Sequence, residues 1–247
     1  MTFQQLNISQ PVLKALEEKQ FSTPTSIQQQ AIPVALGGRD ILGLAQTGTG
    51  KTAAFAIPVI EHLYRKSQAE KTRSIRALVL TPTRELAIQI EEAFAAYGKY
   101  TRLKCVVIYG GVRQNRQVEQ LRRGADILIA TPGRLLDLIS QKIVDLGSVT
   151  HFVLDEADRM LDMGFVHDIK RLLPLLPQKR QNLLFSATMP KEIAVISETI
   201  LHQPVKVEAA PVSSVVDTIE QRLYWVEKNE KIALLVDVLN THIDKTI

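Results

Sequence analysis

The sequence holds very few of the side chains that cross-link small proteins or bind transition metals. Among its 247 residues there are one cysteine, Cys105, and five histidines that are scattered along the chain. One thiol cannot form a disulfide within the chain, and no Cys/His spacing typical of a zinc site is present. We therefore expect a fold held together by its apolar core, with Cys105 as one of the small residues of that core.

Long apolar runs are also missing. No window reaches about 18 consecutive uncharged apolar residues, the length that a membrane-spanning helix needs. The opening residues, MTFQQLNISQ, show neither the cationic start nor the apolar stretch of a secretory leader. These absences indicate a cytoplasmic protein that does not enter a membrane. The formal net charge of +4 is compatible with a polyanionic partner but does not require one.

Short apolar segments alternate with longer segments of helical period. Sequences such as RELAIQIEEAFAAYGKY repeat apolar residues every three or four positions. Apolar runs without polar alternation indicate strands that are covered on both faces. The pattern predicts an α/β fold, a doubly wound and mainly parallel sheet with helices on both faces. The predicted strands are residues 41–45, 77–80, 105–109, 126–130, 151–154 and 182–185.

The composition changes near Gln203. The segment QPVKVEAAPVSSVVDT is rich in small residues and prolines, which is typical of a linker or a surface crossing. After it, QRLYWV has the pattern of a strand and EKIALLVDVLNTH that of an amphipathic helix. We expect one domain over residues 1–207, a linker over 208–220, and the start of a second domain over 221–247.

The segment AQTGTGKT, residues 45–52, follows a predicted strand and opens a helix. Successive backbone N–H groups from Gly48 to Thr52 can surround a polyphosphate at the positive end of that helix. In this pattern Lys51 reaches the β- and γ-phosphates and the hydroxyl of Thr52 ligates Mg²⁺. Ala45 stands where the usual pattern has glycine. An ordinary glycine turn before a helix is the less favoured interpretation.

The segment HFVLDEAD supplies a second group of candidate residues. Asp155, at the end of an apolar strand, suits a carboxylate that holds Mg²⁺ through water, and Glu156 can orient and deprotonate an attacking water. The alternative is that both acids only favour the next helix through its dipole. The phosphate-binding segment AQTGTGKT upstream, which has the pattern of a P-loop, favours the hydrolytic interpretation. Ser186 and Thr188 in FSATMP follow another strand, and a functional role and a helix-capping turn explain them equally well.

Two interpretations compete for PTSIQQQAI, residues 24–32. Thr25 and Gln28 fit a capping box, with Thr as the N-cap and Gln as the third helical residue. The amide of Gln28 also offers a donor and an acceptor that can match N7 and N6 of adenine, and Phe3 could stack on the base. From these residues alone the helix cap is favoured.

The chain contains the same corner twice, as LVLTPTREL and LIATPGRLL. If Thr81 and Thr131 are N-caps and the following prolines are the first helical residues, then Arg84 and Arg134 are each the third helical residue. A cation there opposes the helix dipole, whereas a bound anion would remove the conflict. The alternative is that each Arg points to solvent or pairs with a carboxylate. Two matching corners favour consecutive phosphates of a nucleic-acid strand.

These motifs occur in the order and spacing of a known family. QFSTPTSIQ, AQTGTGKT, PTRELA, Gly110–Gly111, TPGR, DEAD and SAT resemble the N-terminal RecA-like domain of DEAD-box ATP-dependent RNA helicases of superfamily 2. IQQQAIP, DEADRMLDMGF and RQNLLFSAT are similar to its bacterial RhlE-type branch. The resemblance implies a RecA-like P-loop domain that binds ATP, Mg²⁺ and single-stranded RNA backbone. It also implies that ATP hydrolysis contributes to the remodelling of RNA duplexes.

The resemblance also assigns roles to residues. It makes Gln28 the reader of adenine, so that ATP is implied over GTP, and it links Asp158, Ser186 and Thr188 to the coupling between ATP and RNA. The implied catalytic residues are Lys51, Thr52, Asp155 and Glu156, with Thr52 and Asp155 at the Mg²⁺. The implied ATP-binding residues are Phe3, Phe21, Thr23, Gln28, Gln46, Thr47, Gly48, Thr49, Gly50, Lys51 and Thr52. The implied RNA contacts are Pro82, Thr83, Arg84, Gly110, Gly111, Thr131, Pro132, Gly133 and Arg134.

One residue departs from the family pattern, because Gln20 stands where the family usually has glycine before the aromatic. A second RecA-like domain is expected in the full-length protein, and we expect a monomer that binds RNA largely without sequence preference, since phosphate contacts carry no sequence information. Two alternatives remain: a standalone nucleotide-dependent RNA-binding module without helicase turnover, and a DNA translocase of the same superfamily.

Overall fold

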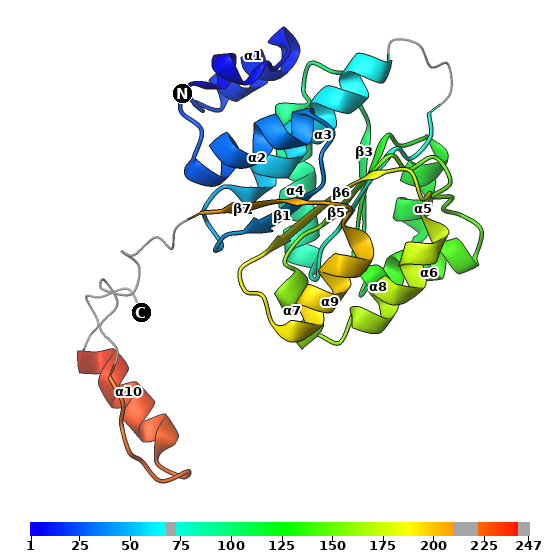
Figure 1. Cartoon of the computed structure of the whole chain (residues 1–247). Coiled ribbons are helices and arrows are strands. Elements are labelled where there is room, and N and C mark those ends of the chain that lie inside the picture. Colours follow the sequence, from blue (N-terminus) through cyan, green and yellow to red (C-terminus); the bar gives the residue numbers. More distant parts are fainter. Residues whose placement is uncertain (68–72, 210–221, 242–247) are drawn as a thin grey trace. The chain divides into compact units, whose positions relative to one another are not determined.

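The computed structural model describes residues 1–67, 73–209 and 222–241. Within these ranges the main element is a parallel seven-stranded sheet with the order β3-β4-β2-β5-β6-β1-β7 (Figure 1). The predicted doubly wound α/β fold is confirmed. The strands are β1 (Ile41–Leu44), β2 (Ala77–Leu80), β3 (Cys105–Ile108), β4 (Ile127–Ala130), β5 (His151–Leu154), β6 (Gln181–Ser186) and β7 (Val205–Glu208).

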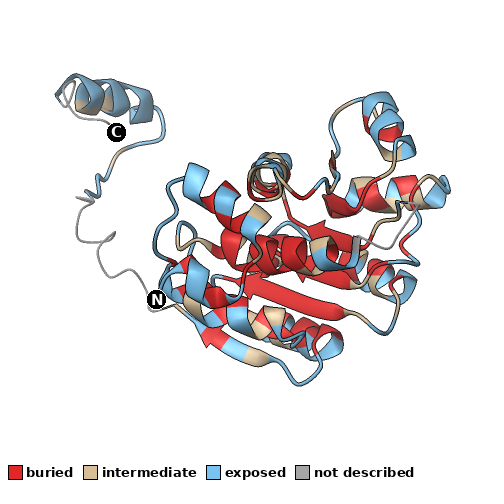
Figure 2. Cartoon of the chain, turned by 90° about the horizontal axis from the view of Figure 1, so that it is seen from above, coloured by how far each residue is buried: buried red, intermediate tan, exposed pale blue. Residues whose placement is uncertain are grey.

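Successive residues of each central strand enter opposite apolar layers, because side chains alternate across a sheet. In β2, Ala77 and Val79 face one layer, while Leu78 and Leu80 face the other. All four residues of β2, β4 and β5 are buried. Figure 2 shows red strands between the layers of helices. This burial on both faces explains why the sequence shows continuous apolar runs.

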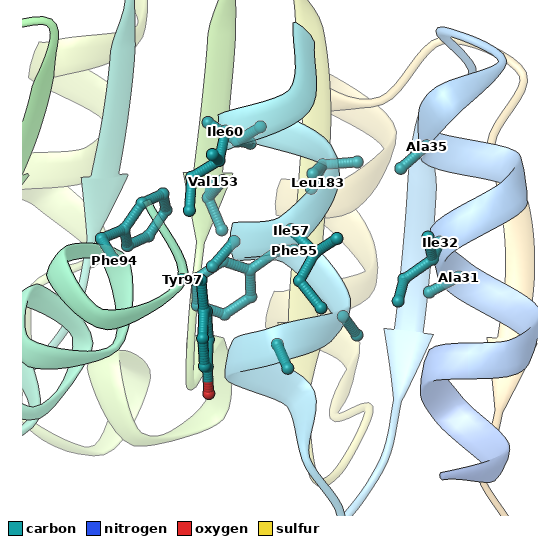
Figure 3. Close-up of a cluster of buried hydrophobic side chains, with 14 of the residues drawn as sticks. Ala31, Ile32, Ala35, Phe55, Ile57, Ile60, Phe94, Tyr97, Val153 and Leu183 are labelled. Carbon is teal, nitrogen blue, oxygen red and sulfur yellow. The ribbon is translucent and has the colours of Figure 1, made fainter. Parts of the chain in front are cut away.

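One face of the sheet is covered by the N-terminal helices. Large side chains of α3 and α4, such as Phe55, Ile60 and Phe94, pack with Ile32 of α2 and with Val153 of β5 (Figure 3). Phe185 of β6 leaves no room for a side chain on the neighbouring strand, since a Cβ at Gly43 would lie 2.4 Å from its ring. The elements here are η1 (Phe3–Leu6), α1 (Gln10–Glu18), α2 (Ser26–Leu36), α3 (Lys51–Ser67) and α4 (Arg84–Tyr97).

The other face is covered by the later helices, which Figure 1 shows on the opposite side of the sheet. Leu135, Met160, Ile169 and Ile193 from four of these helices are fully or almost fully buried against Phe152 and its neighbours in the second layer. The elements are α5 (Asn115–Arg122), α6 (Pro132–Ser140), α7 (Ala157–Asp162), α8 (Val166–Leu172), η2 (Leu173–Leu175) and α9 (Lys191–Ile200).

Only the first residue of the predicted linker, Glu208, lies in a strand, and the bounds of the linker stay a prediction. Residues Val205–Glu208 form the edge strand β7, which pairs in parallel with β1 from Ile41↔Val205 to Leu44↔Glu208. Of its four residues only Val207 is buried, as suits an edge strand, and so the alternation of VKVE carried the strand signal within a proline-rich segment. The rest of the predicted linker falls largely on residues 210–220, which lie outside the described residues.

The chain divides into two units, Met1–Pro211 and Val212–Ile247. The second contains the predicted helix as α10 (Lys231–Thr241). The expected strand QRLYWV is not formed, since the described residues 222–227 have no regular structure. A strand needs a neighbour to satisfy its backbone groups, and none is present for this segment in the described part of the unit. Trp225 and Ile232 are 93% and 78% exposed, so the described residues of this unit build no core around them.

Gln20 adopts the conformation for which the family pattern has glycine. Helix α1 ends in a Schellman motif, in which Phe21 N–H donates to Leu16 O (3.0 Å) and Gln20 N–H donates to Glu17 O (2.8 Å). This motif requires a left-handed residue just after the helix, and Gln20 has φ 58°. The departure from glycine therefore leaves the loop geometry intact and adds strain to the backbone.

We expect Gln20→Gly to raise the free energy of unfolding by about 0.5–1 kcal/mol. The left-handed conformation costs a non-glycine residue roughly 1–2 kcal/mol, and part of the gain is offset by the greater freedom of glycine in the unfolded chain. Urea unfolding followed by circular dichroism measures the change. Gln20→Ala is the control, because it keeps the strain and should bring no gain. Equal stability of the Gln20→Gly and Gln20→Ala variants would show that the left-handed conformation at position 20 is not strained.

Candidate nucleotide and nucleic-acid site

The P-loop has the predicted strand, loop and helix context. It connects β1 to α3, and Gly48 and Gly50 have left-handed φ angles of 85° and 90°. The turn is held by a hydrogen bond from the Thr49 hydroxyl to Gln46 O (2.7 Å). A Cβ at Gly50 would also lie 2.3 Å from Gln28 Nε2. Glycine is thus required at position 50 by both its backbone angle and its neighbour.

Gln28 serves the helix and the P-loop together. The capping box of α2 is confirmed, with Thr25 N–H donating to Gln28 Oε1 (3.0 Å). The Nε2 group of the same amide donates to Gly50 O (3.1 Å), and the Thr25 hydroxyl donates to Thr49 O (2.8 Å). The amide keeps a second N–H and a second lone pair. Helix capping and adenine recognition are therefore compatible roles for this residue.

Lys51 and Asp155 form the electrostatic centre of the site. Both side chains are buried, and neither Lys51 Nζ nor Asp155 Oδ1 has a hydrogen-bond partner among the described residues. Burial raises the pKa of Asp155 to about 7; Lys51 opposes this rise and Glu156 adds to it. Buried groups without partners are costly and rare. They suit a site whose partners are a polyphosphate and a divalent cation.

These residues line a cavity of about 310 Å³. It brings together nine of the predicted site residues, namely Phe21, Gln28, Thr47, Gly48, Gly50, Lys51, Thr52, Asp155 and Glu156. Four predicted ATP-binding residues do not line it: Phe3, Thr23, Gln46 and Thr49. Of these, Thr49 and Gln46 shape the P-loop turn through their mutual hydrogen bond.

The aromatic prediction needs a correction at Phe3. This ring is only 3% exposed and lies outside the cavity lining. It stacks on Phe21, with ring centroids 6.4 Å apart and an interplanar angle of 21°, and Phe21 lines the cavity. Phe3 was expected to stack on the base, but the apolar packing of η1 draws it into the core. Its effect on a base would be indirect, through the position of Phe21.

One wall of the cavity is formed by α4, whose residues the sequence analysis did not predict as part of the site. Leu86, Gln89, Ile90 and Tyr97 of α4 line it, and the Tyr97 ring lies 5.8 Å from that of Phe21. Their spacing puts them on one face of α4, which the helical period could have indicated. The sequence does not say that this face meets the P-loop, since that depends on how α4 packs beside α3.

Asp158 joins the acidic segment to the SAT motif. Its carboxylate accepts hydrogen bonds from Thr188 N–H (2.8 Å) and Thr188 Oγ1 (2.9 Å), and its own N–H donates to Ser186 Oγ (3.1 Å). Burial acts to raise the pKa of Asp158, but hydrogen bonding with Thr188 and Ser186 outweighs it, so the pKa lies below the usual value. The alternative of a simple Ser/Thr turn does not account for these bonds between the ends of β5 and β6.

The first corner differs from its prediction. Helix α4 begins at Arg84, and Thr83 is its N-cap, accepting a hydrogen bond from Leu86 N–H (3.3 Å). Thr81 is therefore not the cap, Pro82 is not the first helical residue, and Arg84 is the first residue rather than the third. The hydroxyl of Thr83 supplies the cap two residues later than expected. Arg84 is exposed, with its guanidinium 5.1 Å from the Tyr109 ring.

The second corner has the predicted form, because α6 begins at Pro132 after the N-cap Thr131, and Arg134 is the third helical residue. Its guanidinium, however, is mostly buried and already hydrogen-bonded within the protein. It donates to Gln117 Oε1 (2.9 Å) in α5 and to Val112 O (2.8 Å) in the loop that follows Gly110 and Gly111. Gly133 is exposed. The two arginines therefore play different parts, one exposed and one holding a loop.

Gln117 of α5 is a further residue that sequence reasoning missed. It is 6% exposed, donates to Tyr109 O (3.1 Å) and accepts from both Tyr109 N–H and Arg134. It joins the loop with Gly110 and Gly111 to the second corner. The strands β3, β4 and β2 are neighbours in the sheet, so the three loops that follow them form one row at its carboxyl edge. No sequence pattern marked Gln117, because its role depends on this neighbourhood.

The fold and the site together define a P-loop nucleotide-binding domain with a second polar region beside the nucleotide cavity. The family model described as DEAD/DEAH box helicase matches residues 25–196. The chain therefore belongs to the DEAD/DEAH box helicase family. The family prediction from the motifs is confirmed, while the RhlE-type branch stays a prediction.

Individual relatives agree with this assignment. The chain is 43% identical over 244 residues to DEAD-box ATP-dependent RNA helicase RhpA of Helicobacter pylori, which covers 99% of this chain and 48% of that protein. It is 44% identical over 247 residues to ATP-dependent rRNA helicase RRP3 of Meyerozyma guilliermondii, covering 100% of this chain and 51% of that protein. The chain thus spans about half the length of these relatives.

A solved structure gives the same fold. The crystal structure of a hypothetical ATP-dependent RNA helicase from Sulfolobus tokodaii is 38% identical and has a TM-score of 0.75, with 82% of this chain and 57% of that chain covered. None of the helices in the described ranges is long and apolar enough to cross a membrane.

We expect Asp155→Asn to stabilise the protein in the absence of nucleotide and Mg²⁺, by about 1–4 kcal/mol at about pH 8. The pKa of Asp155 is about 7 in the folded protein, above its value in the unfolded chain. Between about pH 4 and 7 the folded state keeps a proton that the unfolded state has released, so the stability falls as pH rises through this window. Asp155→Asn removes this fall in the free energy of unfolding. The variant should therefore be no more stable than wild type near pH 4.

Denaturant unfolding in EDTA at several pH values measures this difference. Asp162→Asn is the control, since Asp162 is an exposed acid at the end of α7 and should show no such pH-dependent gain. An Asp155→Asn variant that is less stable than wild type at alkaline pH would contradict the dominance of burial at Asp155.

Proposed function

We propose that this chain is the N-terminal core domain of an ATP-dependent RNA helicase, which binds ATP with Mg²⁺ and the backbone of single-stranded RNA. One observation carries the proposal. The cavity lies at the carboxyl ends of β1 and β5, and Lys51 Nζ and Asp155 Oδ1 in it have no hydrogen-bond partner among the described residues. The row of polar loops follows β3, β4 and β2 of the same described sheet. The names of the relatives support this function, since they are RNA helicases.

The hydrolytic roles follow from the chemistry of the cavity. Lys51 would hold the β- and γ-phosphates, and the backbone N–H groups from Gly48 to Thr52 would surround them. Thr52 and Asp155 would hold Mg²⁺, the latter partly through water, and the ion would neutralise charge on the phosphates. Glu156 would orient the attacking water and accept its proton. It is mostly buried, and Arg159 lies 3.3 Å from its carboxylate.

Adenine would be read by Gln28, which lines the same cavity as Phe21 and Tyr97 and whose amide keeps a second N–H and a second lone pair. Thr23 is exposed just before the helix, and it remains a predicted contact together with Gln46 and Thr47. The RNA backbone would meet Thr83, Arg84, Gly110, Gly111 and Gly133. Pro82, which precedes the cap of α4, and Thr131 and Pro132 at the start of α6 would shape that surface. Arg134 would act mainly by holding the glycine loop.

The link between the two ligands would pass through Asp158. Its bonds to Ser186 and Thr188 tie the segment that contains Asp155 and Glu156 to the end of β6. A change at Glu156 on nucleotide binding would therefore be felt at the SAT motif.

Turnover and strand separation would need a second RecA-like domain, which would close over ATP and RNA. The chain spans about half of its relatives, and α10 has apolar residues, such as Ile232 and Leu235, that are exposed. We place the linker and the start of that domain at residues 208–220 and 221–247. A cytoplasmic, monomeric protein remains a prediction. The standalone RNA-binding module and the DNA translocase are not favoured by the relatives, which are named as RNA helicases.

We expect the 247-residue chain to hydrolyse ATP near the background rate and not to unwind duplexes. An arginine finger from a second domain is worth about 10³–10⁵ in rate, and the described residues build one RecA-like domain. Phosphate release with and without RNA, compared with a chain extended into a second domain, measures the effect. Lys51→Ala in the extended chain is the control for contaminating ATPase. Robust RNA-stimulated turnover by the 247-residue chain would contradict the prediction.

We expect Arg84→Ala to weaken the binding of single-stranded RNA severalfold and to lower the slope of affinity against salt by about one ion. Arg84 is exposed and has no side-chain hydrogen bond or ion pair with any described residue, so its removal leaves the fold intact. Fluorescence anisotropy with labelled RNA over a salt series measures both quantities.

Arg171→Ala is the matched control, since Arg171 is an exposed arginine of α8 on a different face. ATP binding should be unchanged in both variants. A DNA strand of the same sequence as competitor tests the translocase alternative. RNA affinity unchanged in Arg84→Ala would mean that the first corner does not meet phosphate.

A further inference from the structure

A second cleft lies at the amino-terminal ends of the strands. It has a volume of about 520 Å³ and lies between the end of α2, the last turns of α3, and the starts of β5 and β6. His151, the first residue of β5, lines this cleft, whereas Asp155, just past the other end of the strand, lines the nucleotide cavity. Four residues of strand separate the two by about 13 Å. The cleft is therefore distinct from the proposed ATP and RNA sites.

Three cationic side chains line this cleft: Lys66, Lys179 and Arg180. No aspartate or glutamate lines it among the described residues, and neither lysine there has an ion pair with a described carboxylate. The guanidinium of Arg180 is fixed, because its Nε donates to Asn182 Oδ1 (2.8 Å) and its Nη1 to Pro177 O (2.6 Å). Its Nη2 group makes no hydrogen bond to a described residue. Among the described residues that line the cleft, no carboxylate balances this positive charge.

Asp40 is an acid near Arg180. Burial lowers the pKa of the Arg180 guanidinium, and the negative charge of Asp40 opposes this change. Its carboxylate is already bonded to the backbone N–H groups of Asn182 and His202 and to the amide of Asn182. Asp40 is buried and does not line the cleft, so it does not compete with a ligand for the lysines.

The floor of the cleft is a pair of histidines in a hydrogen-bonded chain. His62 Nε2 lies 3.1 Å from Leu36 O, His62 Nδ1 lies 2.9 Å from His151 Nε2, and His151 Nδ1 lies 2.8 Å from the Thr150 hydroxyl. A carbonyl only accepts, so His62 carries its proton on Nε2, and in the neutral pair His151 donates from Nε2. His151 Nδ1 then accepts from the Thr150 hydroxyl, whose single proton has Arg76 O, at 3.2 Å, as an alternative acceptor.

The His151 ring is kept neutral by its surroundings. Burial lowers the pKa of His151 to about 3, and the neighbouring charges of His62, Lys66 and Arg76 add to this effect. An anion in the cleft would offset the nearby cations and so raise the pKa of His151. The imidazole signals of the pair should therefore respond to an anion that the lysines bind.

We propose that this cleft binds a small phosphate-bearing anion through Lys66, Lys179 and Arg180, above the floor formed by His62 and His151. Lys66 and Lys179 are exposed and Arg180 is half-buried, and none of the three has an ion pair with a described carboxylate. The fixed fork of Arg180 with two flexible ammonium groups suits the several oxygens of a phosphate. The volume admits a phosphorylated small molecule. A long RNA strand is a poorer match, because the exposed candidates for its backbone lie at the opposite edge of the sheet.

The test uses the 247-residue chain labelled with ¹⁵N and inorganic pyrophosphate as the probe. Long-range ¹H–¹⁵N spectra resolve the imidazole rings, and His62→Gln and His151→Gln assign them. This readout is specific to the cleft, so binding of the probe at the P-loop does not obscure it. We expect the His62 and His151 signals to shift in a saturable way, while those of His167, exposed on α8, stay in place.

Lys66→Ala and Lys179→Ala should each weaken this binding about tenfold, since each removes one charge-assisted contact. Lys170→Ala, at an exposed lysine of α8, is the matched control and should have no effect. Imidazole signals that do not move through the millimolar range, or equal affinities in all three lysine variants, would overturn the site. A single-stranded RNA that moves the same signals at lower concentration than pyrophosphate would overturn its assignment to small anions.

Discussion

The parallel sheet with both faces buried is the constraint on which the rest of the molecule depends. Since helices cover both faces, polar side chains can gather only where strands begin and end. At the carboxyl ends, the loops after β1 and β5 line the nucleotide cavity, and those after β3, β4 and β2 make the proposed RNA surface. The order of the strands alone therefore decides which motifs become neighbours.

The nucleotide cavity contains buried polar atoms that lower the stability of the free protein but suit the binding of a ligand. Lys51 and Asp155 are buried without hydrogen-bond partners, among the described residues, at the atoms that would meet ligand, and Asp155 keeps a proton up to about pH 7. The same side chains would be satisfied by phosphate and Mg²⁺, so the binding free energy would include the relief of this cost. Gln28 adds a second restraint, because its capping amide is bonded to the backbone of Gly50.

Much of this arrangement could be predicted from the sequence, for a physical reason. Strands buried on both faces show continuous apolar runs, and the P-loop and DEAD residues come directly after two of them, so their position at the carboxyl edge followed from local pattern. The cap at Thr25 and Gln28 was also local, as was the helix α10. The family match agreed with these motifs.

The failures concern contacts between distant segments. The strand β7 was missed because a short edge strand in a proline-rich segment is stabilised by β1 and not by its own sequence. The strand expected at QRLYWV had no neighbour among the described residues. Thr83 rather than Thr81 caps α4, a choice that depends on the fully buried environment of Thr81. Tyr97, Gln89 and Gln117 reach their sites only through the packing of α4 and α5.

The bonds of Gln117 have a consequence for the proposed RNA surface. One buried amide joins the backbone of Tyr109 to Arg134, and Arg134 joins Val112, so the glycine loop and the second corner are held together before any ligand arrives. A strand that binds there would find its phosphate contacts already spaced, and little conformational entropy of these loops would be lost. The loops after β3 and β4 would therefore act as a fixed template to which the flexible RNA must conform.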